Sequence, residues 1–428
     1  MTPEPFIPTS RRELIESLSG SDRLSPVDQL EFKKFCEILS AYSHFAGQKN
    51  LELMKSAFAE FDPNDDGPKE QLASAQTRSE SAGILIEAFD RTLKRANFQH
   101  LPEQAIREAL NKASIIPVQT AVEFDDFEKF AFYFRTSNVI ETKVKKWFKT
   151  KSIEVDNYDR MAVFLQVKEE ALVDQASEAH ERDLIPGKIY LNLYKNVPHY
   201  DLELLFPNLK ISMNLKDKLM LAIPAVGAAV PLALKVLPSI GLLVGAIAIV
   251  VFGLELGGRF VIEDTDQKAV YALFTAVLSI SLALGGFAAR QLLKYKSRRL
   301  EFLKKVADVL FFKTLDVGKG VLNALVDSAE EEECKEMILV FYILVLSEHP
   351  MTVQNVDMAC ESWLSERYDI NVNFDTKKAL QSLAAIRNPD SDEDVSIVFR
   401  SDDGRYSAVD IEQAKRLIDC VWDNAFKY

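Results

Sequence analysis

The sequence has few cysteines and no cysteine motif. Cys36, Cys334, Cys360 and Cys420 are far apart and form no Cys-x-x-Cys pair. Disulfide frameworks and zinc sites use numerous or closely spaced cysteines. We therefore expect reduced thiols, no disulfide and no bound metal.

The chain also lacks an excess of basic residues and any short catalytic motif. Its 51 Lys and Arg against 64 Asp and Glu give a net charge of -13, which disfavours nucleic acid as a partner. It contains no phosphate-binding Gly loop, no Gly-x-Ser-x-Gly, no His-Glu-x-x-His and no Cys/His cluster. We predict no catalytic residue and no cofactor; an enzyme with scattered site residues is the third alternative for function.

The first twenty residues lack the features of a cleaved targeting segment. They contain no apolar core, and Glu4, Glu13 and Glu16 do not fit the acid-poor pattern of a mitochondrial presequence. We expect the polar parts of the chain to stay on the side of the membrane where they are made.

Two long apolar stretches occupy the middle of the sequence. The first, residues 219–254, has Lys235 as its only charge, and the second, residues 269–289, has none. As a helix, the second would span about 31 Å, close to the ~30 Å of a bilayer core. We predict crossings at 236–254 and 269–289, with 219–234 either interfacial, re-entrant or a third crossing.

Basic residues near these stretches predict an orientation. They are Lys216, Lys218, Lys235, Arg290, Lys294, Lys296, Arg298 and Arg299. The connecting loop is acidic instead, with Glu255, Glu263, Asp264 and Asp266. By the positive-inside rule, both termini face the cytoplasm and the lipid bilayer is a partner.

Small residues recur at a spacing of four within, and just after, the predicted crossings. The pairs are Gly241 with Gly245, Gly253 with Gly257, and Ser281 with Gly285. Such pairs allow close helix packing. Packing within the hairpin and a dimer interface both remain open.

The polar regions on either side predict an α+β fold. Helical spacing of apolar residues covers 25–60 and 81–113, and alternation typical of strands covers 128–135, 160–168 and 188–195. We expect a helical region (1–120), a small α+β domain with an antiparallel sheet (121–218), a membrane region (219–291) and a C-terminal domain (292–428). Phe132, in the aromatic strand, is expected in the core rather than stacked on a nucleobase.

Two polar motifs have structural and functional interpretations. Residues 61–67 imitate the start of a calcium loop, but Ala73 stands where the bidentate carboxylate is required, so we favour a turn. His199 lies beside Asp201 without a nucleophile motif, so we favour a structural role.

The C-terminal region shows the element order of a winged helix. Helical patterns at 321–347, 352–366 and 375–386 precede a hairpin at 395–408 and a last helix at 410–426. The charge run Glu330–Glu333 is interpreted as a solvated face. From Met351 onward, fifteen acidic residues oppose nine basic ones, and the candidate recognition helix offers only Lys377, Lys378 and Arg387, which favours protein partners over DNA.

Several segments together resemble the transmembrane protein 143 family, from about Phe35 to about Leu380. They are YKNVPHYDLELLFP, FDPNDD, LKRANFQHLPEQAIREAL, VEFDDFEKFAFYFR and LDVGKGVLNALVDSAEEEECKEMILVFYIL. The motif before the first apolar stretch contributes Asn196, Pro198, Asp201, Leu202, Glu203 and Pro207, and His199-Tyr200 within it makes the chain a divergent member. The resemblance implies a domain of unknown function in a bacterial inner membrane, or a mitochondrial membrane in a eukaryote, and brings no catalytic residue.

The sequence therefore predicts an α+β membrane protein with a transmembrane helical hairpin and a C-terminal winged-helix-like domain. Its expected function is that of a membrane-anchored interaction or scaffold protein, with an unknown protein partner or a homo-oligomer. The alternative is a membrane-tethered winged-helix regulator that binds DNA.

Overall fold

A computed structural model describes residues 6–64, 75–111, 119–146, 149–169, 184–212, 264–373, 375–387 and 395–424. The chain forms two compact units. The first contains residues 1–109, 124–205 and 313–428, and the second contains residues 110–123 and 206–312.

The prediction of an integral membrane protein is wrong for the part of the chain that the structure describes. Within that part, no helix is long and apolar enough to cross a bilayer. The transmembrane hairpin, the location in a bacterial inner or mitochondrial membrane and the cytoplasmic orientation of both termini are therefore not supported. The mixture of helices and sheet, in contrast, is observed.

The predicted second crossing belongs to a much longer element. Residues 269–289 lie within α6 (Asp264–Asp308), a helix of 45 residues, about twice the length that spans a bilayer core. The uncharged stretch passes without interruption into a basic stretch of the same helix, so its length in the sequence does not mark a separate bilayer-spanning element. The predicted segments 219–234 and 236–254 lie outside the described residues.

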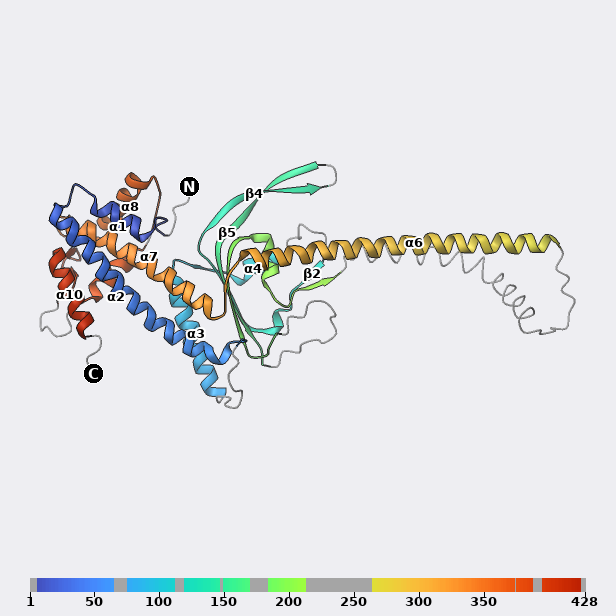
Figure 1. Cartoon of the computed structure of the whole chain (residues 1–428), viewed down its shortest axis with the longest axis horizontal. Helices are drawn as coiled ribbons and strands as arrows, with labels where there is room; N and C mark the ends of the chain where they lie inside the picture. Colours follow the sequence, from blue (N-terminus) through green and yellow to red (C-terminus); the bar gives the residue numbers. More distant parts are fainter. Residues whose placement is uncertain are drawn as a thin grey trace. The chain divides into compact units, whose positions relative to one another are not determined.

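Helices from the N-terminal and C-terminal parts of the chain form the core of the first unit. They are α1 (Arg11–Ser19), α2 (Pro26–Phe58), α3 (Ala75–Arg95) and α7 (Lys319–Val345). Helix α2 starts where the Ser25 side chain accepts a hydrogen bond from the Asp28 backbone, with proline at the first helical position. Helices α2 and α7 pack side by side (Figure 1), and the rings of Phe35 and Phe341 stack 4.1 Å apart.

A six-stranded antiparallel sheet lies beside these helices in the same unit. The strands are β1 (Gln99–Leu101), β3 (Phe127–Phe134), β4 (Ser137–Lys146), β5 (Lys149–Val167), β6 (Ile189–Pro198) and β8 (Thr314–Val317). The order is β1-β3-β5-β6-β8, and β4 pairs with the first half of β5. The predicted antiparallel sheet is therefore confirmed.

The alternation along the strands separates two apolar faces. Ala162 and Phe164 of β5 and Leu191 of β6 pack against residues of α2, α3 and α7. Phe132 pairs with Val163 on the opposite face and is completely buried. Because a fully buried ring cannot stack on a base, the structure supports the core interpretation of this strand.

The predicted C-terminal elements are all present in the first unit. They are α8 (Val353–Tyr368), α9 (Thr376–Ala385), β9 (Val398–Arg400), β10 (Tyr406–Ala408) and α10 (Ile411–Asn424). Helix α10 packs on α2, where the ring centroids of Trp422 and Phe45 are 5.3 Å apart and Lys415 pairs with Glu31. The C-terminal elements thus share one core with the N-terminal helices.

The second unit contains α6 and a short sheet. Strands β2 (Gln119–Ala121) and β7 (Lys210–Ser212) pair antiparallel. A π-helical turn, Val309–Lys313, follows α6. Helix α4 (Glu103–Asn111) begins in the first unit and ends in the second.

Candidate functional site

The charge run of α7 is the polar centre of the first unit. We call Glu330, Glu331, Glu332, Glu333 and Glu336 the α7 acidic cluster. Glu332 and Glu336 are buried, and every member meets a residue of another segment or a buried cation. The interpretation of Glu330–Glu333 as a solvated face is therefore wrong.

Two members of the cluster hold the N-terminal helices against α7. Glu330 lies 2.8 Å from His44 Nδ1 of α2 and 3.5 Å from the Arg11 guanidinium of α1. Glu331 accepts a hydrogen bond of 2.8 Å from the Arg11 backbone. These contacts join α1 and α2 to one turn of α7.

Glu333 joins α3, α7 and α9. It accepts two hydrogen bonds from the Arg95 guanidinium and lies 3.4 Å from Lys378 Nζ. Paired hydrogen bonds from a guanidinium fix both the distance and the angle of the two groups. The end of α3 is consequently held in a defined position beside the start of α9.

Glu332 forms a buried ion pair. Its carboxylate is 3.1 Å from Lys335 Nζ, and the Arg135 guanidinium is 4.0 Å away. Burial raises the pKa of the Glu332 carboxyl, and the two cations oppose this effect. Such a pair persists in a core only when further hydrogen bonds compensate for the lost hydration.

Glu336 is the most deeply buried carboxyl of the cluster. It accepts a hydrogen bond of 3.2 Å from the Asn97 side-chain amide. Burial raises the pKa of Glu336 to about 7, Glu332 and Glu333 act in the same direction, and Lys378 and the Asn97 hydrogen bond oppose it. The ionisation of this group therefore changes near neutral pH.

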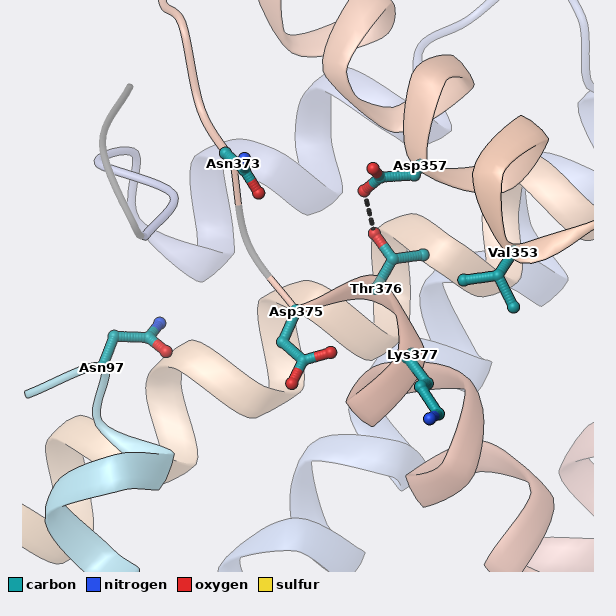
Figure 2. A pocket seen from close by; sticks show the side chains of 7 residues that line it. All are labelled: Asn97, Val353, Asp357, Asn373, Asp375, Thr376 and Lys377. Atoms are coloured by element: carbon teal, nitrogen blue, oxygen red, sulfur yellow. Dashed lines mark hydrogen bonds between the residues drawn. The ribbon is translucent and has the colours of Figure 1, made fainter. Parts of the chain in front are cut away.

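A pocket lined mostly by residues with polar side chains adjoins the cluster at the start of α9. It has a volume of about 480 Å³, and we call it the α8–α9 pocket. Its lining residues are Asn97, Val353, Asp357, Asn373, Asp375, Thr376 and Lys377. Figure 2 shows Asn97 on one side and the first residues of α9 on the other.

The termini of helices α3 and α9 position residues on the two walls of the pocket. Asn97 has φ 60° and ends α3 in a Schellman motif, in which Phe98 N donates to Leu93 O. On the opposite wall, Asp375 caps α9 by accepting from the Lys378 backbone at 3.1 Å. The buried Thr376 hydroxyl donates to Asp357 of α8.

The pocket offers hydrogen bonds and one cation rather than an activated nucleophile. Its walls carry two carboxylates, two carboxamides, a hydroxyl and the Lys377 ammonium. Within the described part of the chain, no group of three or more His, Cys, Asp or Glu could hold a metal ion. The arrangement is therefore suited to binding a polar group.

Replacing Thr376 by valine should lower the free energy of unfolding by about 1–2 kcal/mol. Valine keeps the shape of the side chain but leaves Asp357 without the hydroxyl donor. Urea unfolding monitored by circular dichroism measures the change. Thr376→Ser keeps the donor and should cost less; equal losses for the two variants would contradict the importance of this hydrogen bond.

The motif Asn196–Pro207 forms a packed corner at the end of β6. Asn196 has φ 51°, Pro198 ends β6, and the 3-10 helix His199–Leu205 follows. Asp201, Leu202 and Glu203 are buried, with Asp201 3.7 Å from Lys313. His199 Nδ1 lies 3.1 Å from the Tyr158 hydroxyl, and Pro207 lies in the following turn. These contacts support the structural interpretation of the motif.

The calcium-like motif begins with a residue that is already paired. Asp62 is buried, accepts a hydrogen bond from the Asn64 backbone at 3.0 Å, and lies 3.2 Å from Lys319 Nζ. This geometry is that of an Asx turn. Residues 65–74, including the position predicted to close the loop, lie outside the described residues.

The remaining residues predicted from the sequence fall on α6 or outside the described residues. Those on α6 are Ser281, Gly285, Arg290, Lys294, Lys296, Arg298 and Arg299. Those outside the described residues are Lys216, Lys218, Lys235, Gly241, Gly245, Gly253 and Gly257. A Cβ added to Gly285 would meet no described atom within 4 Å, so the described residues show no close packing at this glycine.

Comparison with known protein families identifies part of the chain. Residues 158–320 match the model of a family described as a protein of unknown function (DUF3754). The match covers less than half of the chain and includes β6, the corner that follows it and α6; all residues of the α8–α9 pocket lie outside it. No solved structure matches the chain. The resemblance to the transmembrane protein 143 family stays a prediction.

Proposed function

We propose that this protein is an interaction protein and that its α8–α9 pocket receives a polar group of a protein partner. The observation that carries this proposal is the ion-pair network behind the pocket. Glu333 binds Arg95 of α3 and Lys378 of α9, and these two elements carry the opposite walls. A pocket whose walls are held in place before binding loses little conformational entropy when a partner enters.

The lining chemistry supports a partner with both donors and acceptors. Asp357 and Asp375 accept hydrogen bonds, Lys377 donates them, and the amides of Asn97 and Asn373 do both. Hydrogen bonds and charges of this kind give specificity at the polar rim of protein interfaces. The network holds segments from both sides of the apolar stretches in one body, which supports a role in which the two regions together contact a partner.

A photo-crosslinking residue tests the proposal in cells of the source organism. Placed at Lys377, in the pocket, it should give one discrete adduct with a partner or a second copy. The same residue at Asp402, on the exposed turn between β9 and β10, is the matched control. Asn373→Arg on the pocket wall should abolish the adduct. The proposal fails if position 377 gives no more adduct than position 402 and the purified full chain is a monomer by light scattering.

The element order from α7 to α10 favours DNA binding as a second candidate function. The charge distribution opposes it, because Lys378 of the candidate recognition helix is already paired with Glu333 and bonded to the Arg95 carbonyl. We expect the full chain to bind duplex DNA with a Kd weaker than about 10 μM at 50 mM salt. Fluorescence anisotropy over a salt series measures this. Tighter binding with a steep salt dependence would establish the regulator instead.

A further inference from the structure

The segment Phe6–Ser10 is held on the first unit in the manner of a bound peptide. It forms neither a helix nor a strand, and the side chain of Ile7 is completely buried in the core. The Lys335 ammonium donates hydrogen bonds to two backbone carbonyls of this segment, that of Ile7 and, at 3.1 Å, that of Thr9. The contacts are therefore with backbone oxygens and one apolar side chain.

The receiving surface is built by α7 and the end of β3. Lys335 is 3% exposed and is positioned by Glu332 at 3.1 Å. The Arg135 guanidinium lies 4.6 Å from the centre of the Phe6 ring and 4.0 Å from Glu332. We call the surface formed by Glu332, Lys335 and Arg135 the α7–β3 surface.

The chemistry of the α7–β3 surface selects a short peptide with a bent main chain. One ammonium binds the carbonyls of both Ile7 and Thr9, which requires a main chain curved enough to bring the two oxygens together. The buried position of Ile7 selects an aliphatic residue, and the guanidinium over Phe6 selects an aromatic residue immediately before it. Recognition by main-chain hydrogen bonds with pockets for single side chains is a common mode of peptide binding.

Occupation by the chain's own segment is a local arrangement. The segment precedes α1 and lies outside helices and strands, so its departure from the α7–β3 surface would expose the Ile7 side chain and the Glu332–Lys335 pair without unfolding a regular element. A segment outside regular structure can open at a lower free energy than the whole fold. A competing peptide must displace a tethered copy that is present at a high effective concentration.

We propose that the α7–β3 surface is a binding site for a short segment of a partner protein, bent as Phe6–Thr9 is and containing an aromatic residue followed by an aliphatic one, and that Phe6–Thr9 occupies this site in the isolated chain. The site is separate from the α8–α9 pocket. The partner's segment would replace Phe6–Thr9 and use the same Lys335 hydrogen bonds.

A binding experiment with purified components tests this proposal. A variant that starts at Ser10 keeps the cap of α1 and leaves the α7–β3 surface uncovered. A fluorescent, amidated peptide of residues 1–9 should bind this variant at least about tenfold more tightly than it binds the full chain, whose tethered copy competes. The same peptide with Ile7→Asp should not bind measurably. Arg135→Gln in the truncated chain should weaken binding by about fivefold.

A second variant separates a folding failure from a binding failure. Ile7→Asp in the full chain expels the segment while keeping its length, and this protein should also bind the wild-type peptide. Absence of peptide binding to a folded variant would overturn the proposal. Loss of helical circular dichroism in both variants would overturn it too, because the segment would then be an integral part of the core. The crosslinking experiment at Lys377 reports on another surface and can succeed or fail independently.

Discussion

Replacing Lys335 by methionine is expected to lower the free energy of unfolding by about 3–5 kcal/mol. The side chains of Lys335 and Glu332 are 4% and 5% exposed, so removal of the ammonium leaves a buried carboxylate with only the more distant Arg135 as a counter-charge. The two carbonyls of Ile7 and Thr9 also lose their donor. Urea unfolding of the full chain at pH 7.5 measures the loss.

A matched control comes from helix α2. Glu52 and Lys55 have the same order and the same spacing of three residues, but their side chains are 62% and 30% exposed. Lys55→Met should change stability by less than about 0.5 kcal/mol. The double variant Glu332→Leu with Lys335→Met should recover part of the loss, because an apolar pair needs no counter-charge. Equal effects of Lys335→Met and Lys55→Met would contradict the energetic role of burial.

Replacing Glu336 by glutamine is expected to stabilise the protein at alkaline pH and to have little effect in acid. The pKa of Glu336 is raised from 4.5 to about 7 in the folded chain, so the folded state holds a proton that the unfolded state has released. Its contribution to stability therefore falls as pH rises from about 4.5 to about 7. The full decrease in the free energy of unfolding, from pH values below both pKa values to pH values above both, is about 3 kcal/mol.

The measurement compares urea unfolding of wild type and Glu336→Gln at pH 5 and pH 8.5. Glutamine keeps an oxygen that can accept from the Asn97 amide, and it carries no charge at either pH. We expect a gain of up to about 3 kcal/mol at pH 8.5 that largely disappears at pH 5. Glu52→Gln, an exposed change on α2, should show no such dependence. A pH-independent effect of Glu336→Gln would show that packing, and not ionisation, is responsible.

The regular elements could be predicted because their signals are local. The alternation Phe130, Phe132, Phe134 located β3, and the turn 401–404 located the hairpin between β9 and β10. The end of α3 has a local signal too. Basic residues such as Lys94 and Arg95, followed by an asparagine such as Asn97, are typical of a helix that ends in a left-handed residue. That signal would have placed Asn97 at a defined turn.

The polar centre could not be predicted because its partners are distant in the sequence. A run of glutamates on a helix is ordinarily solvated, and nothing near Glu333 shows that Arg95 and Lys378 will meet it. The same holds for the α8–α9 pocket, whose walls come from residues 97 and 353–377. The membrane prediction failed for a related reason: an uncharged window shows that a segment is apolar, but not where its helix ends.

The pairing of α2 with α7 determines when the protein can fold during its synthesis. The partner of residues 26–58 is residues 319–345, so at 5–20 residues per second α2 leaves the ribosome on the order of tens of seconds before α7 exists. Throughout that interval Phe32 and Phe35, buried in the finished fold, have no α7 to cover them. These rings of α2 therefore remain without their native partner until residues 319–345 have been synthesised.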